Sequence, residues 1–115
     1  MNFPSKYDFL EAFGIEPAEE DSSMAYYRYV KPSPNGELEI DISFSAISHS
    51  FQVVLRCRGH VVATVSSEKV KFIQLRSDKS GDGIHVVFDI QGVNSEVWVK
   101  LEPEVNFHWW VLRST

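Results

Sequence analysis

The sequence of 115 residues contains one cysteine, Cys57. A single thiol excludes an internal disulfide framework and any metal site built from several cysteines. Cys57 falls in phase with the apolar residues Val53 and Leu55. We therefore expect a small core residue and not a reactive thiol, because free cysteine is among the most frequently buried residue types.

Long apolar runs are also missing, and the first residues lack the basic and apolar segments of a signal peptide. We therefore expect a soluble, cytoplasmic protein with no membrane partner. The hydrophobic content of 43% supports an ordinary globular core. Two cores in so short a chain would both be marginal, so a single domain spanning residues 1–115 is predicted.

Basic residues are scarce. The formal net charge is −5, and residues 1–41 contain nine acidic side chains against three basic ones. Because nucleic acid selects for clustered lysine and arginine, this distribution argues against a nucleic-acid partner. The acidic N-terminal third instead fits a basic protein partner, since opposite potentials steer encounter.

Motifs that carry chemistry are absent as well. The four histidines, His49, His60, His85 and His108, have no spacing that brings two ligands to one metal, and no serine or glycine lies in a nucleophile or phosphate-loop motif. His85 and Asp89 share one strand face but lie too far apart along it for a direct bond. No activated nucleophile accompanies them. We therefore expect a protein that is not an enzyme and that has no catalytic, metal or cofactor site.

What the sequence does contain is strict alternation of polar and apolar residues, clearest from Glu37 to Phe44. Successive side chains of a strand point to opposite faces, so this pattern predicts a strand with one buried and one wet face. Similar patterns predict strands over 24–30, 51–57, 61–65, 68–76, 84–90, 96–101 and 106–112. In the segment 68–76 the apolar register shifts between Phe72 and Ile73, which predicts a β-bulge or a residue buried on both faces.

A short helix is expected before these strands. Ser5 is a favourable N-cap with Asp8 three residues later, and Gly14 suits the C-terminal end. Phe9 and Phe13 would pack this helix on the sheet, where we expect it to cover the last strand, which is apolar on both faces. Residues 16–23 read as an acidic loop. The fold class is therefore mainly β (α+β): an N-terminal helix on a twisted antiparallel sheet of seven or eight strands, whose meander forms a half-barrel or sandwich.

Two groups of residues are candidates for binding a partner. Glu37, Glu39 and Asp41 lie on one strand face with roughly 7 Å between neighbours. They form either the solvated side of the sheet or an acidic strip that meets a basic partner, and we weigh the two interpretations equally. The acidic residues nearby in sequence, Glu19, Glu20 and Asp21, would extend such a strip.

The aromatic residues Tyr26, Trp98 and Trp110 fall opposite the aliphatic rows of their strands. One interpretation is a second small core under the helix. The other is an exposed aromatic patch that binds a protein, or a stacking platform for a sugar ring.

The segments Phe88-Asp89-Ile90-Gln91-Gly92 and Asn106-Phe107-His108-Trp109-Trp110 resemble the closing strands of small bacterial immunity proteins of contact-dependent inhibition and other polymorphic toxin systems. Length, acidity, one short helix and a β-meander fit the same resemblance. It implies a non-enzymatic inhibitor that covers a toxin domain, often a nuclease with a basic cleft. Glu37, Glu39 and Asp41 would then mimic phosphates, and Tyr26 or Tyr29 would supply buried anchors.

The alternative is a small-ligand or carbohydrate-binding β-module that uses Trp98 or Trp110. Unpaired edge strands also leave a homodimer open.

Overall fold

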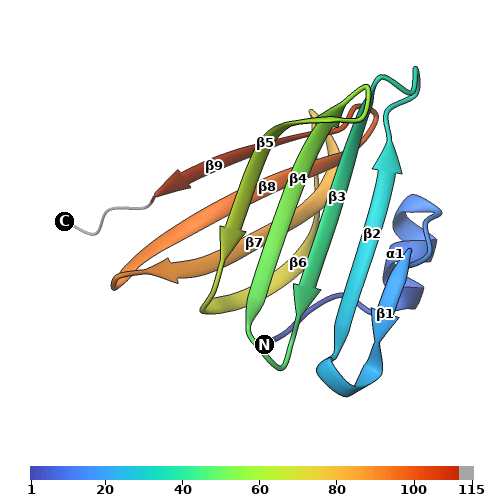
Figure 1. Ribbon diagram of the computed structural model, residues 1–115. Helices are drawn as coiled ribbons and strands as arrows, with labels where there is room; N and C mark the ends of the chain where they lie inside the picture. The colour runs from blue at the N-terminus through green and yellow to red at the C-terminus, as the bar shows by residue number, and fades with distance from the viewer. Residues whose placement is uncertain (112–115) are drawn as a thin grey trace.

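Two antiparallel sheets contain most of the chain in the computed structural model, which describes residues 1–111 (Figure 1). The first sheet has the order β1 (Glu19–Asp21), β2 (Tyr26–Pro32), β3 (Leu38–Ser45), β4 (Ser50–Cys57) and β5 (His60–Ser67). The second has the order β6 (Val70–Asp78), β7 (Gly81–Ile90), β8 (Val93–Glu102) and β9 (Asn106–Val111). No strand pairing joins the two sheets among the described residues, so they pack as a sandwich and do not close into a barrel. The predicted fold class is confirmed.

The core lies between the sheets and is built from the apolar rows that alternation predicted. Ile40 and Ile42 of β3 are at most 1% exposed, and they belong to the same buried cluster as Ile84 and Val86 of β7. Burial of aliphatic side chains at this level contributes about 1.5–3 kcal/mol each to folding. No helix in the described part of the chain is long and apolar enough to cross a membrane.

The helix α1 (Lys6–Phe13) begins and ends as predicted. The Ser5 hydroxyl accepts a hydrogen bond from the Asp8 amide, the Asp8 carboxylate accepts one from the Ser5 amide, and Gly14 adopts a left-handed conformation at φ 66°. Phe9 stacks on Tyr29 of β2 with ring centroids 3.9 Å apart.

The prediction that α1 covers the last strand is wrong. Figure 1 shows α1 beside β1 and β2, whereas β9 extends across the other side of the molecule. The reason is the aromatic cluster of β2 and β3, which offers Phe9 stacking partners that are close in the chain. Trp109 of β9 remains 50% exposed. Leu112, which we also placed in this strand, lies outside the described residues.

Part of the predicted acidic loop is a strand. Glu19–Asp21 pairs with β2, so residues 1–111 contain nine strands where seven or eight were predicted. The chain reverses between β1 and β2 through a 3₁₀ turn (Ser22–Met24), where the Asp21 carboxylate accepts a hydrogen bond from the Ser23 amide. An ion pair from Arg28 to Glu19 at 2.8 Å then fixes the pairing. The Arg28–Glu19 pair joins two strands, and alternation in a three-residue segment cannot reveal such a contact.

The predicted bulge is confirmed in β6, where the register shifts between Val70 and Phe72. Two further register shifts occur, between Leu55 and Arg56 and between Asp82 and Gly83. The first of these places an additional residue in β5, at the outer surface of the first sheet.

Replacing Tyr29 with phenylalanine is expected to leave the free energy of unfolding unchanged or to raise it by about 1 kcal/mol. The Tyr29 side chain is 1% exposed, and its hydroxyl has no hydrogen-bond partner within residues 1–111. Burial, with smaller contributions from Tyr27 and Glu20, raises the pKa of this hydroxyl to about 12. Urea denaturation measures the effect, with Tyr7→Phe at a 69% exposed position as the matched control. A loss of more than about 1 kcal/mol in Tyr29→Phe alone would show that the hydroxyl stabilises the fold.

Candidate interaction face

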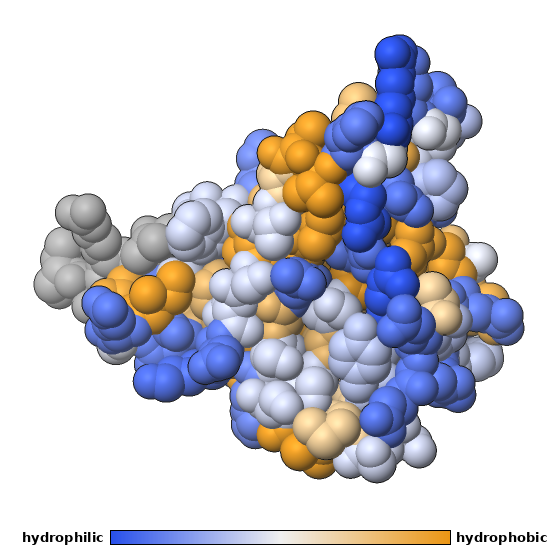
Figure 2. Space-filling view, in the orientation of Figure 1, coloured by the Kyte–Doolittle hydropathy of each residue, from blue (hydrophilic) through white to orange (hydrophobic). Residues whose placement is uncertain are grey.

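The surface of the first sheet that points away from the second sheet is polar, and we call it the outer face. Figure 2 shows it in front, with strongly hydrophilic side chains running across the strands. The predicted carboxylates Glu37, Glu39 and Asp41 lie together on this face, because Ile40 and Ile42 occupy the alternate positions in the core. Their shared face is therefore confirmed.

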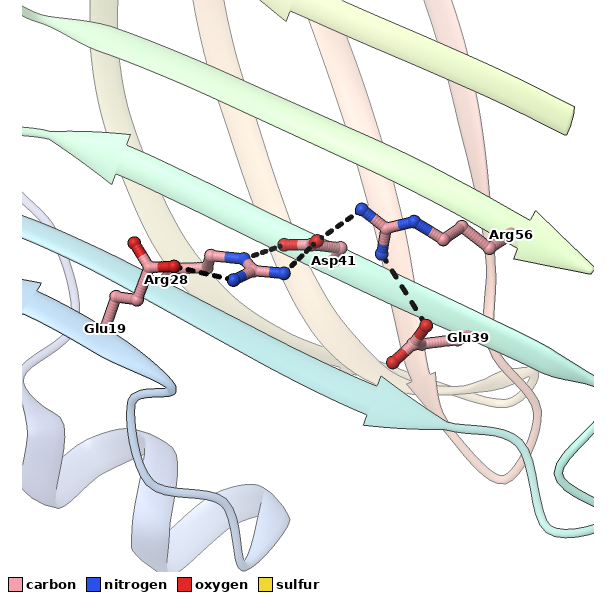
Figure 3. A network of polar contacts seen from close by, with 5 residues as sticks. All are labelled: Glu19, Arg28, Glu39, Asp41 and Arg56. Carbon is pink, nitrogen blue, oxygen red and sulfur yellow. Dashed lines mark hydrogen bonds and ion pairs between the residues drawn. The ribbon is translucent and has the colours of Figure 1, made fainter. Parts of the chain in front are cut away.

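The carboxylates are not free, however, because arginines from neighbouring strands alternate with them (Figure 3). Arg28 of β2 donates from Nε and Nη2 to the two carboxylate oxygens of Asp41, at 2.9 and 2.8 Å, and from Nη1 to Glu19 at 2.8 Å. Arg56 of β4 contacts Asp41 at 2.8 Å and Glu39 at 3.6 Å. We call these five residues the charge ladder. It crosses four strands, from β1 to β4.

Arg58 and Glu37 extend the charged surface beyond the charge ladder. Arg58, in the turn between β4 and β5, contacts Glu37 at 3.0 Å. Both side chains are more than half exposed, so this pair contributes little to stability. It does place further charge at the same end of the outer face.

Asp41 is the centre of the charge ladder. Its side chain is 7% exposed, whereas those of Glu19 and Glu39 are 58% and 39% exposed. Burial alone would raise the pKa of Asp41, but the hydrogen bonds and charges of Arg28 and Arg56 outweigh it and hold the pKa below the ordinary value of 3.8. Asp41 therefore orients two arginines, while Glu19 and Glu39 remain accessible to a partner.

The stability of the protein is expected to fall as the pH drops below about 4, in part through Asp41. A carboxyl whose pKa is lowered by folding stabilises the native state above its unfolded pKa, and this contribution is lost as the pH falls through the folded pKa. Asp41→Asn lacks this contribution, so its free energy of unfolding should change less between pH 5 and pH 2 than that of the wild type. Urea denaturation across this range measures both slopes. Parallel curves would contradict a lowered pKa for Asp41.

Tyr26, another predicted binding residue, lies on the outer face at the opposite end from Glu37. It borders a hollow of about 590 Å³. The other lining residues are mostly small and polar: Ser43, Phe44, Ser50, Phe51, Gln52, Ser66, Ser67 and Glu68. Gln52 donates to the Ser66 hydroxyl at 2.9 Å across β4 and β5. This end of the outer face therefore offers hydrogen-bonding groups with little charge.

The acidic segment of β1 is divided between two surfaces. Glu19 joins the charge ladder, and Asp21 lies on the same face opposite Tyr26. Glu20 points the other way and pairs with Lys6, the first residue of α1, at 3.1 Å. Alternation along a strand explains the division. The structure therefore places all the predicted carboxylates except Glu20 on the outer face, with Asp21 at the opposite end from Glu37.

Trp98 lies far from these residues, on the outward side of the second sheet. Its side chain is 6% exposed, and the Arg76 guanidinium sits 5.2 Å from the ring centroid. The interpretation of Trp98 as part of a core under the helix is wrong, because Trp98 lies on the outward side of the second sheet, where Arg76 of β6 packs on it across β7. An indole covered in this way offers no open stacking surface for a sugar ring.

Sequence reasoning missed the exposed valines of β5. Arg56 pairs with Val61 while Leu55 pairs with Ala63, so Val62 is the additional residue of a bulge. Val61 and Val62 are 61% and 56% exposed, and Figure 2 shows an apolar patch over the upper ends of β4 and β5. The adjacent valines, which interrupt the alternation, were the available signal. Among residues 1–111, no three histidine, cysteine, aspartate or glutamate side chains gather as a metal site.

The fold recurs in a chain of a solved complex. The similar structure is described as a contact-dependent growth inhibition toxin–immunity protein complex from Klebsiella pneumoniae 342. The TM-score is 0.87, and the alignment covers 96% of each chain at 20% sequence identity. No known protein family and no curated protein matches the sequence. At this identity the likeness establishes a shared fold over the whole domain.

Proposed function

We propose that this protein is the immunity protein of a contact-dependent growth inhibition system, and that it neutralises a cognate toxin domain by binding it without catalysis. The observation that carries the proposal is the fold shared over 96% of its length with a chain from a toxin–immunity complex. The sequence resemblance of β7 and β9 to immunity proteins points in the same direction. Neutralisation would take place in the cytoplasm of the protected cell.

The outer face is the binding surface that we propose. It combines the accessible carboxylates of Glu19, Glu37 and Glu39 with a fixed arrangement of arginines and with the two exposed valines. Protein interfaces commonly have an apolar centre with charged groups around it, and the charged groups set specificity and association rate. The charge ladder is held by the buried Asp41, so little side-chain entropy is lost when a partner binds.

The partner of such a surface would be basic in its contact region. The outer face carries the five carboxylates of Glu19, Asp21, Glu37, Glu39 and Asp41 against the three guanidinium groups of Arg28, Arg56 and Arg58. A nuclease toxin has a basic substrate cleft, and an acidic surface placed over it would exclude the nucleic acid. We therefore propose a nuclease toxin, contacted by Glu37 and Glu39 and at the other end by Asp21 and Tyr26.

The carbohydrate-binding alternative loses one of its two indoles, because Trp98 is 6% exposed beneath Arg76. The other, Trp110, is half-buried on β9. The hollow beside Tyr26 has no tryptophan in its lining.

Co-purification tests the proposed function. The tagged protein would be expressed in its native host, washed at low salt, and the retained proteins identified. We expect one basic protein at equal stoichiometry, encoded beside this chain as the C-terminal domain of a large secreted protein. If the encoded toxin domain were purified separately and did not bind this protein, the proposal would be contradicted.

A further inference from the structure

The free edge of β5 differs from the edges that β1 and β6 form, and it is longer than the fourth edge strand, β9. β1 is three residues long and entirely acidic. β6 is interrupted by a bulge and is partly covered by Asn2, whose carbonyl accepts a hydrogen bond from the Ile73 amide at 2.9 Å. Short length, charge, bulges and covering segments are the usual devices that prevent a sheet edge from pairing with another chain.

β5 has only one of these protections. It is eight residues long, and neither a charged side chain nor a proline occurs in it. Its bulge lies near its beginning, at Val61 and Val62, so Ala63–Ser67 keeps a regular register with β4. Among the described residues, no backbone hydrogen bond joins Ala63–Ser67 to any segment other than β4. Five residues of regular, uncharged strand are therefore available for pairing.

We propose that this edge pairs with β5 of a second copy of the chain, so that the two five-stranded sheets form one continuous antiparallel sheet. A two-fold axis at Val65 sets Val65 opposite its counterpart and Thr64 opposite Ser66 of the second copy. On the inner side the partly buried valines then continue the core across the interface. On the outer side hydroxyl groups face one another, and Thr–Ser pairs of this kind stabilise antiparallel strands.

The second copy is favoured over another occupant because the segment is complementary to itself under two-fold symmetry. An isologous contact requires that the same patch match its own rotated image. Ala63–Ser67 satisfies this requirement: Val65 meets Val65, Thr64 meets Ser66, the small Ala63 faces the small Ser67, and no like charges oppose one another. Strand pairing by one edge is a small contact, so we expect a weak dimer whose population rises with protein concentration. The outer faces of both copies remain open.

Thr64→Lys tests the proposal. Thr64 is exposed on the outer face in the middle of the free segment. Its replacement would bring two lysines to diagonal positions across the axis, and we expect the dimer dissociation constant to rise by about tenfold or more. The matched control is Ser77→Lys, which adds the same charge to an exposed position on the edge strand β6.

Sedimentation equilibrium of the full chain over a concentration series provides the measurement. The expected average mass rises from 13.2 kDa towards twice that value for the wild type and Ser77→Lys, and stays near 13.2 kDa for Thr64→Lys. Thermal unfolding of each variant confirms that it is folded. A wild-type mass of 13.2 kDa up to the solubility limit would overturn the proposal, as would a dimer of undiminished strength in Thr64→Lys. The toxin is absent from this experiment, so its result is independent of the proposed function.

Discussion

Asp41→Ala is expected to lower the free energy of unfolding by about 2–4 kcal/mol. Asp41 accepts hydrogen bonds from Arg28 and ion-pairs with Arg56, and all three side chains are at most 31% exposed. Removing the carboxylate leaves two partly desolvated guanidinium groups side by side without a counter-charge. The cost therefore includes arginine repulsion and desolvation as well as the lost contacts. Urea denaturation at pH 7 provides the measurement.

The control for this prediction is Asp82→Ala, because Asp82 is an exposed carboxylate on β7 without an ion pair among the described residues. Exposed substitutions of this kind change stability by at most about 0.5 kcal/mol. If Asp41→Ala were equally harmless, Asp41 would not organise the charge ladder. A triple variant with Arg28→Met and Arg56→Met should recover most of the loss, since an apolar replacement leaves no unpaired charge.

Charge reversal of Glu37 and Glu39 is expected to weaken toxin binding by about 30-fold or more at low salt, mainly through the association rate. Both carboxylates are accessible on the outer face, with side-chain exposures of 52% and 39%. Each substitution replaces an attraction to a basic partner with a repulsion. The effect should shrink at high ionic strength, because exposed charges are screened by salt. Binding kinetics at two salt concentrations measure both effects.

Asp41 is unsuitable for this experiment, although sequence alternation placed it in the same strip. A lysine at this 7% exposed position beside two arginines would disrupt the fold, and weak binding would then have two explanations. The matched control is the double variant Asp82→Lys with Glu104→Lys. It changes the net charge by the same amount, and both residues lie outside the outer face. Equal weakening in both double variants would show that net charge, and not this face, determines the association rate.

Alternation predicted the sheets well because side-chain burial has a strict period of two in a strand. Leu38 to Phe44 shows the reason: every second residue is required by the core, so the sequence reports the face directly. The cap at Ser5 and the bulge near Phe72 were also predictable, because each depends on residues that are close in sequence.

Features that depend on contacts between distant residues were not predictable in this way. Asp41 was assigned to the solvated face correctly, but its burial depends on Arg28 and Arg56, which lie on two different neighbouring strands. For Trp98 the sequence left open a core under the helix or an exposed aromatic patch, whereas the residue packs under Arg76. Periodicity indicates which side of a strand a residue occupies, and it does not indicate what covers that side.

The candidate site shows the same division. Glu37, Glu39 and Asp41 were found from spacing alone, whereas the arginines that pair with them were not, because arginine on a strand carries no signature of its partner. The exposure of Val61 and Val62 depends on a single additional residue in β5. A register shift of one residue reverses the face of the residues beyond it. The position of the shift is set by the pairing of β5 with β4, which the sequence of β5 alone does not give.

The measurement that tests the central claim most directly is a titration of the cognate toxin domain with this protein, with toxin activity as the readout. The account predicts that activity falls linearly and disappears at one equivalent, and that Glu37→Lys with Glu39→Lys requires a clear excess for the same inhibition. Full toxin activity in the presence of several equivalents of folded wild-type protein would contradict it.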